Sequence, residues 1–342
     1  MIDWWLILDK VILIVVIFVV SLAIAAYSTY GERKIAAVIQ DRIGPDRAGP
    51  WGILQPLADG GKFFLKEDIT PKDADKFLFI LGPSLFILTA LMTSAIIPWG
   101  KSFYFGDHEF SLQVANLNVG ILYLLAVVSI GGYGIMIGGW ASNNKFALLG
   151  ALRASSQMIS YEVPMGMAII SIVLMSNSLN LREIVDMQQG FHWNVIYQPL
   201  GFLIFLICAF AECNRAPFDL PESESELIGG YHTEYSSMKL GFFLFAEYIN
   251  MFISSAIISC LFFGGYHFPG LDSLNMSPNI AAIVSICVLF AKIFFFIFFF
   301  MWVRWTLPRF RYDQLMRLGW KVLIPLSIFN VLATGAWLTF VK

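Results

Sequence analysis

The stretch AFAECNRAPFDLPESESELIGGYHTEYSSMK, residues 209–239, lies between two strongly apolar runs and carries a dense set of acidic side chains. They are Glu212, Asp219, Glu222, Glu224, Glu226 and Glu234, with Glu247 just beyond. Charged residues make up only 13% of the chain. A carboxylate close to hydrocarbon costs several kcal/mol unless it is paired, hydrated or protonated. The stretch therefore indicates proton or ion handling between membrane spans.

Composition excludes a soluble domain. The chain has 342 residues, 58% of them hydrophobic, including 32 Phe. No globule of this length can bury so much apolar surface. The net charge of −2 comes without the basic face that nucleic acid binding requires, so we expect no nucleic acid partner. The first apolar run is too long for a signal peptide and lacks a small-residue cleavage site, so we expect a retained helix.

Apolar runs long enough to cross about 30 Å of hydrocarbon predict the fold. The predicted spans are 5–27, 77–97, 117–139, 157–175, 196–212, 238–263, 280–302 and 321–341. The prediction is an all-α polytopic membrane protein of about eight transmembrane helices, forming a single integral membrane domain over residues 1–342.

The basic residues predict the orientation. Of the 22 Lys and Arg, most fall in or beside the loops 28–76, 140–156, 213–237 and 303–320. The exceptions are Lys10, Lys101, Arg182 and Lys342 near the other face, and Lys292 within a span. Because cytoplasmic loops carry the excess of Lys and Arg, we expect these loops in the cytoplasm or matrix and both termini outside. A bacterial plasma membrane is favoured, and a mitochondrial inner membrane is the alternative.

The first large loop contains an amphipathic helix, in WGILQPLADGGKFFLKED (residues 51–68). One predicted face carries Trp51, Leu54, Leu57, Phe64 and Leu65, whereas Asp59, Lys62 and Lys66 lie towards the other. This pattern is typical of a helix lying in the membrane interface. A loop helix packed on the spans explains it equally well.

Three charged residues fall inside predicted spans: Glu162, Glu247 and Lys292. We expect Glu247 and Lys292 near the middle of the membrane. Burial penalises the charged form of such groups, so a change in neighbouring charge can shift their protonation. They are candidates for a proton relay, and the alternative is a static pair between Lys292 and either acid.

The acidic loop is predicted to be partly packed. Pro217 and Pro221 restrict its backbone, and Phe218, Leu220, Leu227 and Ile228 alternate with the acids. Arg215 is the nearest counter-ion, and Arg33 and Arg304 are others. The alternative is a loop whose acids are simply solvated.

Histidines and cysteines indicate no metal site. The four cysteines form no CxxC motif, and the four histidines fall in loops, where no pair faces across the bilayer to hold a haem. Any redox centre is therefore expected elsewhere. Trp99, Tyr104 and Trp193 lie in the outer loops and suit interfacial anchoring.

Four stretches of the inner face resemble a known family. They are GERKIAAVIQDRIGPDRAGPWGILQPLADGGKFFLKED, GWASNNKFALLGALRASSQMISYEVP, AECNRAPFDLPESESELIGGYHTEYSSMKLGFFLFAEY and RWTLPRFRYDQLMRLGWK. In content and order they look like the motifs of the quinone-site membrane subunit of respiratory complex I, the proton-pumping NADH:quinone oxidoreductase. The resemblance runs from about residue 5 to the end of the chain.

The resemblance implies a membrane subunit that binds no redox cofactor. Ubiquinone or menaquinone would be the substrate, and the iron–sulfur clusters and flavin would belong to partner subunits. The partners would be the peripheral quinone-site and terminal-cluster subunits, and small membrane subunits that lead to antiporter-like subunits. The quinone channel would involve Glu32, Arg33, Trp51, Asp59, Lys62, Phe64 and Arg215. Proton coupling would involve Glu162, Glu212, Asp219, Glu222, Glu224, Glu226, Glu234, Glu247 and Lys292.

One departure and two alternatives accompany this resemblance. The third span, 117–139, contains no acid where relatives place a carboxylate, so water or another side chain has to bridge there. The first alternative is the membrane anchor of a related hydrogenase or formate-hydrogen lyase, against which the complete loop 28–76 argues. The second is a stand-alone cation/proton antiporter, which needs broken helices in two matching repeats, and no repeat is evident.

Overall fold

The computed structural model describes residues 4–106, 108–220, 227–270 and 277–341, and they form an almost entirely helical bundle. The long helices are α1 (Trp4–Ile39), α3 (Lys76–Thr93), α4 (Gly120–Ala141), α5 (Lys145–Ser176), α10 (Ser237–Phe262), α11 (Pro278–Thr306) and α13 (Ile324–Val341). The shorter helices are α2 (Gln55–Leu65), α6 (Leu181–Asp186), α7 (Asn194–Tyr197), α8 (Pro199–Glu212) and α12 (Tyr312–Arg317). Single 3₁₀ turns are η1 (Pro50–Gly52), η2 (Ser94–Ile96) and η3 (Gly230–His232), and η4 (Leu318–Leu323) is a π-helical stretch between α12 and α13. β1 (Phe103–Phe105) pairs with β2 (His108–Phe110) in a small antiparallel hairpin.

Seven helices within these described ranges are long and apolar enough to cross a membrane, which confirms the predicted fold class. The predicted span 196–212 is not among them, because its helix is too short. Its helix, α8, has 14 residues and rises only about 21 Å at 1.5 Å per residue. The short helix α7 precedes it, so the backbone turns at Gln198 where the hydropathy pattern predicted one continuous span.

Two helices extend well beyond their predicted ends. α1 continues to Ile39, so Glu32 and Arg33 lie on a helix and not in a loop. α5 begins at Lys145, where the Asn144 side chain caps it by accepting the Phe146 N–H at 2.8 Å, so Glu162 lies in the middle of a 32-residue helix. Hydropathy detects the hydrocarbon layer, whereas backbone hydrogen bonding continues into the polar region.

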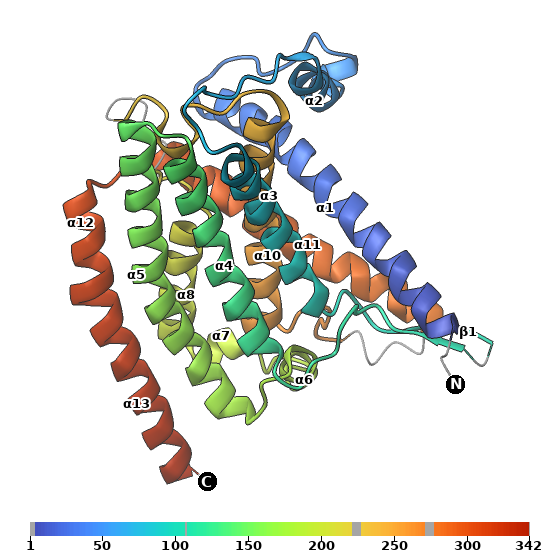
Figure 1. Ribbon diagram of the computed structural model, residues 1–342. Helices are drawn as coiled ribbons and strands as arrows, with labels where there is room; N and C mark the ends of the chain where they lie inside the picture. The colour runs from blue at the N-terminus through green and yellow to red at the C-terminus, as the bar shows by residue number, and fades with distance from the viewer. Residues whose placement is uncertain (1–3, 107, 221–226, 271–276, 342) are drawn as a thin grey trace.

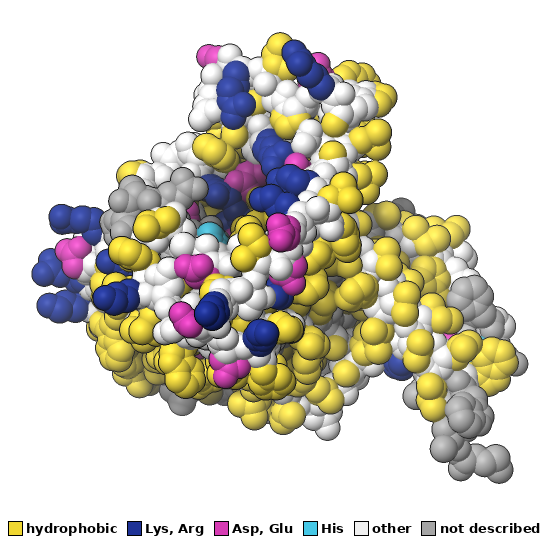
Figure 2. All heavy atoms as spheres, turned by 45° about the horizontal axis from the view of Figure 1, so that its top comes forward, with side chains coloured by type: hydrophobic (Ala, Val, Ile, Leu, Met, Phe, Trp, Pro, Cys, Tyr) yellow, Lys and Arg dark blue, Asp and Glu magenta, His cyan; other side chains and the backbone are white. Residues whose placement is uncertain are grey.

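The bundle has two distinct ends (Figure 1). α2 lies across one end, which we call the α2 end, whereas the start of α1 and the end of α13 lie at the opposite end. Figure 2 looks towards the α2 end and shows Lys, Arg, Asp and Glu side chains gathered there, with hydrophobic side chains around the flanks.

Glycines bring α3 and α4 into close contact. A Cβ atom on Gly82 would lie 2.7 Å from the Gly138 Cα, and one on Gly134 would lie 3.0 Å from the Gly82 carbonyl oxygen. Because helix association in membranes depends on close packing, small residues at such crossings are required.

Candidate functional site

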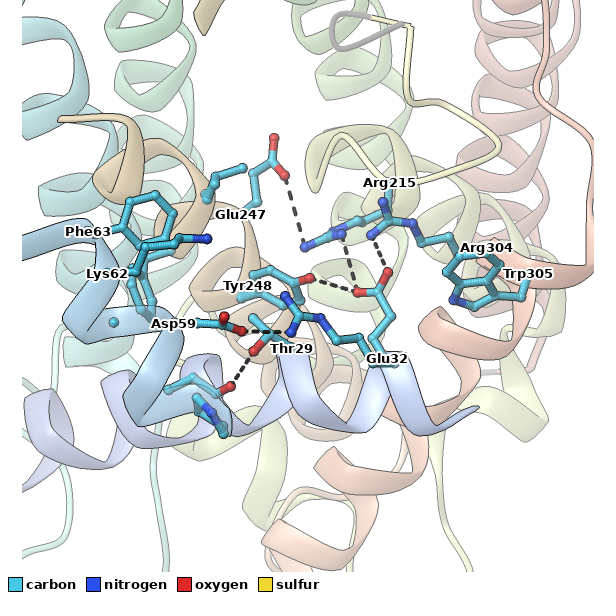
Figure 3. A pocket seen from close by; sticks show the side chains of 16 residues that line it. Thr29, Glu32, Asp59, Lys62, Phe63, Arg215, Glu247, Tyr248, Arg304 and Trp305 are labelled. Carbon is cyan, nitrogen blue, oxygen red and sulfur yellow. Dashed lines mark hydrogen bonds and ion pairs between the residues drawn. The ribbon is translucent and has the colours of Figure 1, made fainter. Parts of the chain in front are cut away.

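A cavity of about 320 Å³ lies near the α2 end, between α1, α2, α10 and α11 (Figure 3). Its walls carry charged and aromatic side chains from segments far apart in sequence. They include Thr29, Glu32, Arg33, Asp59, Lys62, Phe63, Arg215, Phe245, Glu247, Tyr248, Arg304 and Trp305. The cavity therefore combines a polar cluster with apolar walls.

Glu32 of α1 is the centre of the polar cluster. Its side chain is 8% exposed, and its two oxygens contact Arg304 Nη1 at 2.5 Å and Arg215 Nη1 at 3.5 Å. The Tyr248 hydroxyl donates to the same carboxylate at 2.9 Å. A buried carboxylate is stable only with such compensation, so Glu32 fixes the relative positions of α1, α10 and α11.

Arg215 connects this cluster to a second buried acid. Its Nη2 lies 4.0 Å from Glu247 Oε2, with both side chains almost fully buried. The guanidinium also lies over the Tyr248 ring, 4.0 Å from the centroid. The Tyr231 hydroxyl donates to Glu247 at 3.0 Å. A single guanidinium therefore stands between the carboxylates of α1 and α10.

The amphipathic helix α2 forms one wall of the cavity with its polar face. Arg33 pairs with Asp59 at 2.7 Å, and the Ser237 hydroxyl donates to the Phe63 carbonyl at 3.0 Å, which fixes α2 on α1 and α10. The Lys62 ammonium points into the cavity (Figure 3).

The apolar face of α2 points away from the cavity. Trp51 and Phe64, both predicted for the channel, are 75% and 73% exposed and do not line it. The neighbouring Phe63 lines it instead. Both interpretations of this helix thus apply, because it packs on the spans and also presents an apolar outer face.

The acids at mid-bundle lie apart from the cavity. The Ser129 hydroxyl of α4 donates to Glu162 of α5 and also approaches the Leu125 carbonyl at 2.9 Å. Glu212, at the end of α8, is within electrostatic range of Glu162. It lines a separate cavity of about 30 Å³ with Thr89 and other polar residues, enough space for a water molecule. Ser129 supplies the polar contact in the third span, which has no acid.

The acidic loop is partly packed, as predicted. Phe218 and Leu220 are buried, and so is Leu227, whereas Ile228 is 63% exposed. The buried Asp219 pairs with Arg309 at 2.9 Å.

Of the remaining predicted coupling acids, Glu234 accepts a hydrogen bond from Asn144 at 2.5 Å near the surface. Glu222, Glu224 and Glu226 lie outside the described residues.

Lys292 lies at the middle of α11, as predicted, but it does not form the static pair with an acid that was the alternative to a relay role. Its ammonium donates to the carbonyls of Phe263, Gly265 and His267 at 2.6–2.7 Å and lies 5.3 Å from the Trp193 ring centroid. These carbonyls follow the end of α10 that is farther from the cavity. An ammonium has three donors, and all three are used, so a static pair with Glu162 or Glu247 does not form.

Several site residues were not predicted: Phe63, Ser129, Tyr231 and Tyr248. Two of them could have been suspected from the sequence, because Tyr248 directly follows Glu247 and Ser129 is the only serine in its predicted span. No sequence feature points to Tyr231, because its contact with Glu247 depends on how the loop folds back on α10.

No group of His, Cys, Asp and Glu in the described part of the chain could hold a metal ion. Cys208, Cys213 and Cys260 are buried free thiols, and Cys287 is exposed.

Fold and site together define a multi-pass helical membrane protein with a charged cavity beside an amphipathic surface helix. Residues 11–335 match the NADH dehydrogenase family. The chain is 62% identical to an NADH-quinone oxidoreductase subunit of Cytophaga hutchinsonii over 329 residues, 96% of each chain. It is 60% identical to the corresponding subunit of Flavobacterium johnsoniae (96% of this chain, 95% of the relative) and 59% identical to that of Flavobacterium psychrophilum (98% of each). The chain therefore belongs to this family of complex I membrane subunits.

Membership confirms the resemblance drawn from the four inner-face motifs. It makes the chain a component of an enzyme complex whose other subunits are its partners. These relatives are bacterial, which with the membrane-length helices indicates a multi-pass protein of the bacterial plasma membrane.

Proposed function

We propose that this chain forms the membrane side of the quinone access channel, and that its buried acids begin the relay coupling quinone reduction to proton translocation. The observation that carries this proposal is the cavity itself, in which the Glu32 cluster meets apolar walls. A quinone has polar carbonyls on its head and a long apolar tail, so its channel needs both kinds of wall.

The cavity is suited to a carbonyl-bearing head group. Its lining holds four cations, Arg33, Lys62, Arg215 and Arg304, and three acids, Glu32, Asp59 and Glu247. Lys62 makes no ion pair with a described residue, although its aliphatic stem lies beside Phe63 and its ammonium is 5.0 Å from that ring centroid. An ammonium directed into the cavity can donate to a quinone oxygen.

Quinone reduction takes up two electrons and two protons, so the charge beside Glu32 changes during turnover. Arg215 stands between Glu32 and Glu247, and a change at one carboxylate alters the field at the other. Electrons would arrive from iron–sulfur clusters and flavin held by partner subunits. We propose that Glu162 and Glu212 continue the relay, with Ser129 replacing an acid in α4. Glu222, Glu224 and Glu226 remain predicted members of this relay.

The charge distribution supports the orientation expected from the sequence. Lys and Arg gather at the α2 end (Figure 2), which the positive-inside rule assigns to the cytoplasm. Both termini would then lie on the outer side, and the chain would act as one integral domain.

Photolabelling tests the channel. A photoreactive azido-quinone should label peptides that contain 26–33, 56–63 or 244–248 in the purified complex, and excess unlabelled quinone should suppress the label. Labelling confined to other subunits would exclude this cavity from the quinone path.

Glu247→Gln tests the relay. Quinone-dependent proton pumping should fall at least tenfold, while NADH oxidation by ferricyanide, which needs no quinone, stays intact. Glu183→Gln, at an exposed acid of α6, is the matched control. Normal pumping by the Glu247 variant would remove this acid from the relay.

A further inference from the structure

The small cavity beside Glu212, of about 30 Å³, lies at the middle of the membrane. Two of the residues that line it show this depth. Asn250 is thirteen positions after the first residue of the 26-residue helix α10, and Gly131 is eleven positions after the first residue of the 22-residue helix α4. Each lies about 15–20 Å from either end of its helix, and half of the hydrocarbon layer is about 15 Å thick. A charge at this depth is costly unless it is balanced.

Side-chain oxygens form the polar part of this cavity. They come from three helices, and no Lys, Arg or His is among the lining residues. The oxygen-bearing residues are Thr89 and Thr93 of α3, Glu212 of α8, and Asn250 and Ser254 of α10. The hydroxyls of both threonines donate to carbonyls of the preceding turn of α3 at 2.9–3.0 Å. Only their lone pairs remain for a ligand, so these two groups can coordinate or accept but not donate.

Glu212 and Asn250 have no partner in the described part of the chain. Glu212 is 9% exposed and neither forms an ion pair nor accepts a hydrogen bond there, and the Asn250 amide makes no hydrogen bond there. The buried acids of the charged cavity differ, because Glu32 and Glu247 each pair with Arg215 and accept from a tyrosine hydroxyl. Buried polar side chains are nearly always satisfied. These two therefore indicate a ligand, and a buried carboxylate requires a positive one.

The end of α8 adds to the negative field of the cavity. α8 has only 14 residues and ends at Glu212, so its C-terminus lies within the membrane. The C-terminal end of a helix carries a partial negative charge, and helix ends within the membrane coordinate Na⁺ in transporters. Glu162, which is within electrostatic range of Glu212, is also an acid. Arg215, three residues farther on, is directed to Glu32 and Glu247 instead. The surroundings of Glu212 therefore favour a cation.

Charge and size restrict this cation. Glu212 is the one carboxylate among the lining residues, so it balances a monovalent ion, whereas a divalent ion would leave a net positive charge in the hydrocarbon. The space is little larger than a water molecule, which admits Na⁺ and excludes organic cations. Carboxylate and carbonyl oxygens are ligands of hard cations. Protonation alone would neutralise Glu212 but would leave the Asn250 carbonyl oxygen without a partner.

We propose that this cavity binds Na⁺, with Glu212 balancing its charge and Asn250 and the three hydroxyl groups supplying neutral oxygen ligands. Na⁺ and a proton compete for Glu212, so the sodium concentration regulates how readily this acid is protonated. The site goes beyond the quinone channel, because Na⁺ binding needs neither quinone nor turnover.

Binding of radioactive Na⁺ to the purified complex in lipid nanodiscs, without NADH or quinone, tests the site. Choline chloride keeps the ionic strength constant, because choline is too large for the cavity. Asn250→Leu and Thr89→Val each remove one ligand and keep the size of the side chain. Each should raise the Na⁺ concentration for half-occupancy of this site about threefold to tenfold, the effect of one lost polar contact. The double variant should bind less Na⁺ per complex. Thr306→Val, at an exposed threonine of α11 whose hydroxyl also donates to the preceding turn, is the matched control.

Dicyclohexylcarbodiimide locates the ion, because it modifies protonated carboxyl groups in apolar surroundings. Na⁺ at about ten times its dissociation constant should slow modification of the peptide that contains Glu212 about tenfold relative to choline. The double variant should lose this protection.

The outcomes separate this site from the proposed function. Equal Na⁺ binding by the unmodified complex and the double variant overturns the site. So does modification of Glu212 at the same rate in Na⁺ and in choline, which would mean that the cavity holds a proton and water only. Both results leave the quinone channel intact, because neither assay involves quinone. Absence of quinone label from the charged cavity, with Na⁺ binding preserved, contradicts the proposed function and leaves this site intact.

Discussion

Replacing Glu32 by Gln should disrupt the charged cavity between α1, α2, α10 and α11. The substitution keeps the shape of the side chain but removes the charge that balances Arg304 at 2.5 Å and Arg215 at 3.5 Å. Two charges about 4 Å apart interact by about 4 kcal/mol at an effective dielectric constant near 20. Removing one partner of a buried pair typically costs about 3–5 kcal/mol.

If about 3 kcal/mol of this loss falls on the arrangement that accepts quinone, turnover drops about 100-fold. The assay compares NADH:quinone and NADH:ferricyanide activities in the same membranes, and only the first should fall. Asp68→Asn is the matched control, because Asp68 pairs with Lys239 at 3.0 Å but is 53% exposed, and such surface pairs contribute about 0–1 kcal/mol.

A double variant separates the effect of unbalanced charge on assembly from the effect of Glu32 on quinone turnover. Glu32→Gln/Arg304→Met removes both charges and should assemble better than Glu32→Gln alone, as judged by the amount of intact complex on native gels. Full quinone turnover in assembled Glu32→Gln complex would refute the role given to this cluster, whatever its effect on assembly.

Three further predictions concern groups outside the cavity. Ser129→Ala should lower the number of protons pumped per NADH oxidised, whereas Ser129→Thr, which keeps the hydroxyl, should not. If the two variants pump the same number of protons per NADH, Ser129 is not part of the relay. Lys292→Met should destabilise the protein by about 3–5 kcal/mol, because three carbonyls lose a charged donor. The number of protons pumped per NADH oxidised should not change. A selective loss of pumping would instead support the role in proton coupling predicted for Lys292. Burial raises the pKa of Asp186, but hydrogen bonds from His267 and Tyr266 outweigh it, and the net pKa lies below the ordinary 3.8. This stabilisation is present above that value and is lost as the pH falls below it. The protection against hydrogen exchange at 181–187 and 263–268, measured relative to the intrinsic exchange rate at each pH, should therefore fall only at such acidic pH, and Asp186→Asn should abolish this fall. Protection that does not change with pH in the unmodified chain would contradict the prediction.

The sequence predicted the features that depend on hydrocarbon alone. Runs of apolar residues located the long helices because each must satisfy its own backbone in lipid. The last turns of α1 and the first turns of α5 were missed because charged side chains interrupt the apolar runs there, and in α1 these side chains, Glu32 and Arg33, are held in ion pairs. Glu32 illustrates this, since its counter-ion Arg215 is 183 positions away and no local pattern records that pairing.

The same limit applies to the site. The composition of α2 predicted a polar and an apolar face, but not that the polar face would close the cavity while Trp51 and Phe64 point outward. Trp99 looked like an interfacial residue because it follows a span, whereas the chain after α3 turns inward until the Lys101 N–H reaches Ser285 at 2.9 Å. Contacts between segments, which hydropathy does not contain, decided both cases.

The geometry of Arg215 is the basis of the proposed coupling between the cavity and the acids beyond it. Its side chain is 6% exposed, so the carboxylates of Glu32 and Glu247 provide charge balance that water cannot. Protonating or displacing one of them removes one of these two contacts, and at an effective dielectric constant near 20 each such contact is worth about 4 kcal/mol, against about 1 kcal/mol in water. Arg215→Lys, which keeps the charge but not the two-sided fork, should therefore uncouple the two acids: quinone reduction should persist while pumping falls. Equal loss of both would mean that Arg215 serves the cavity alone.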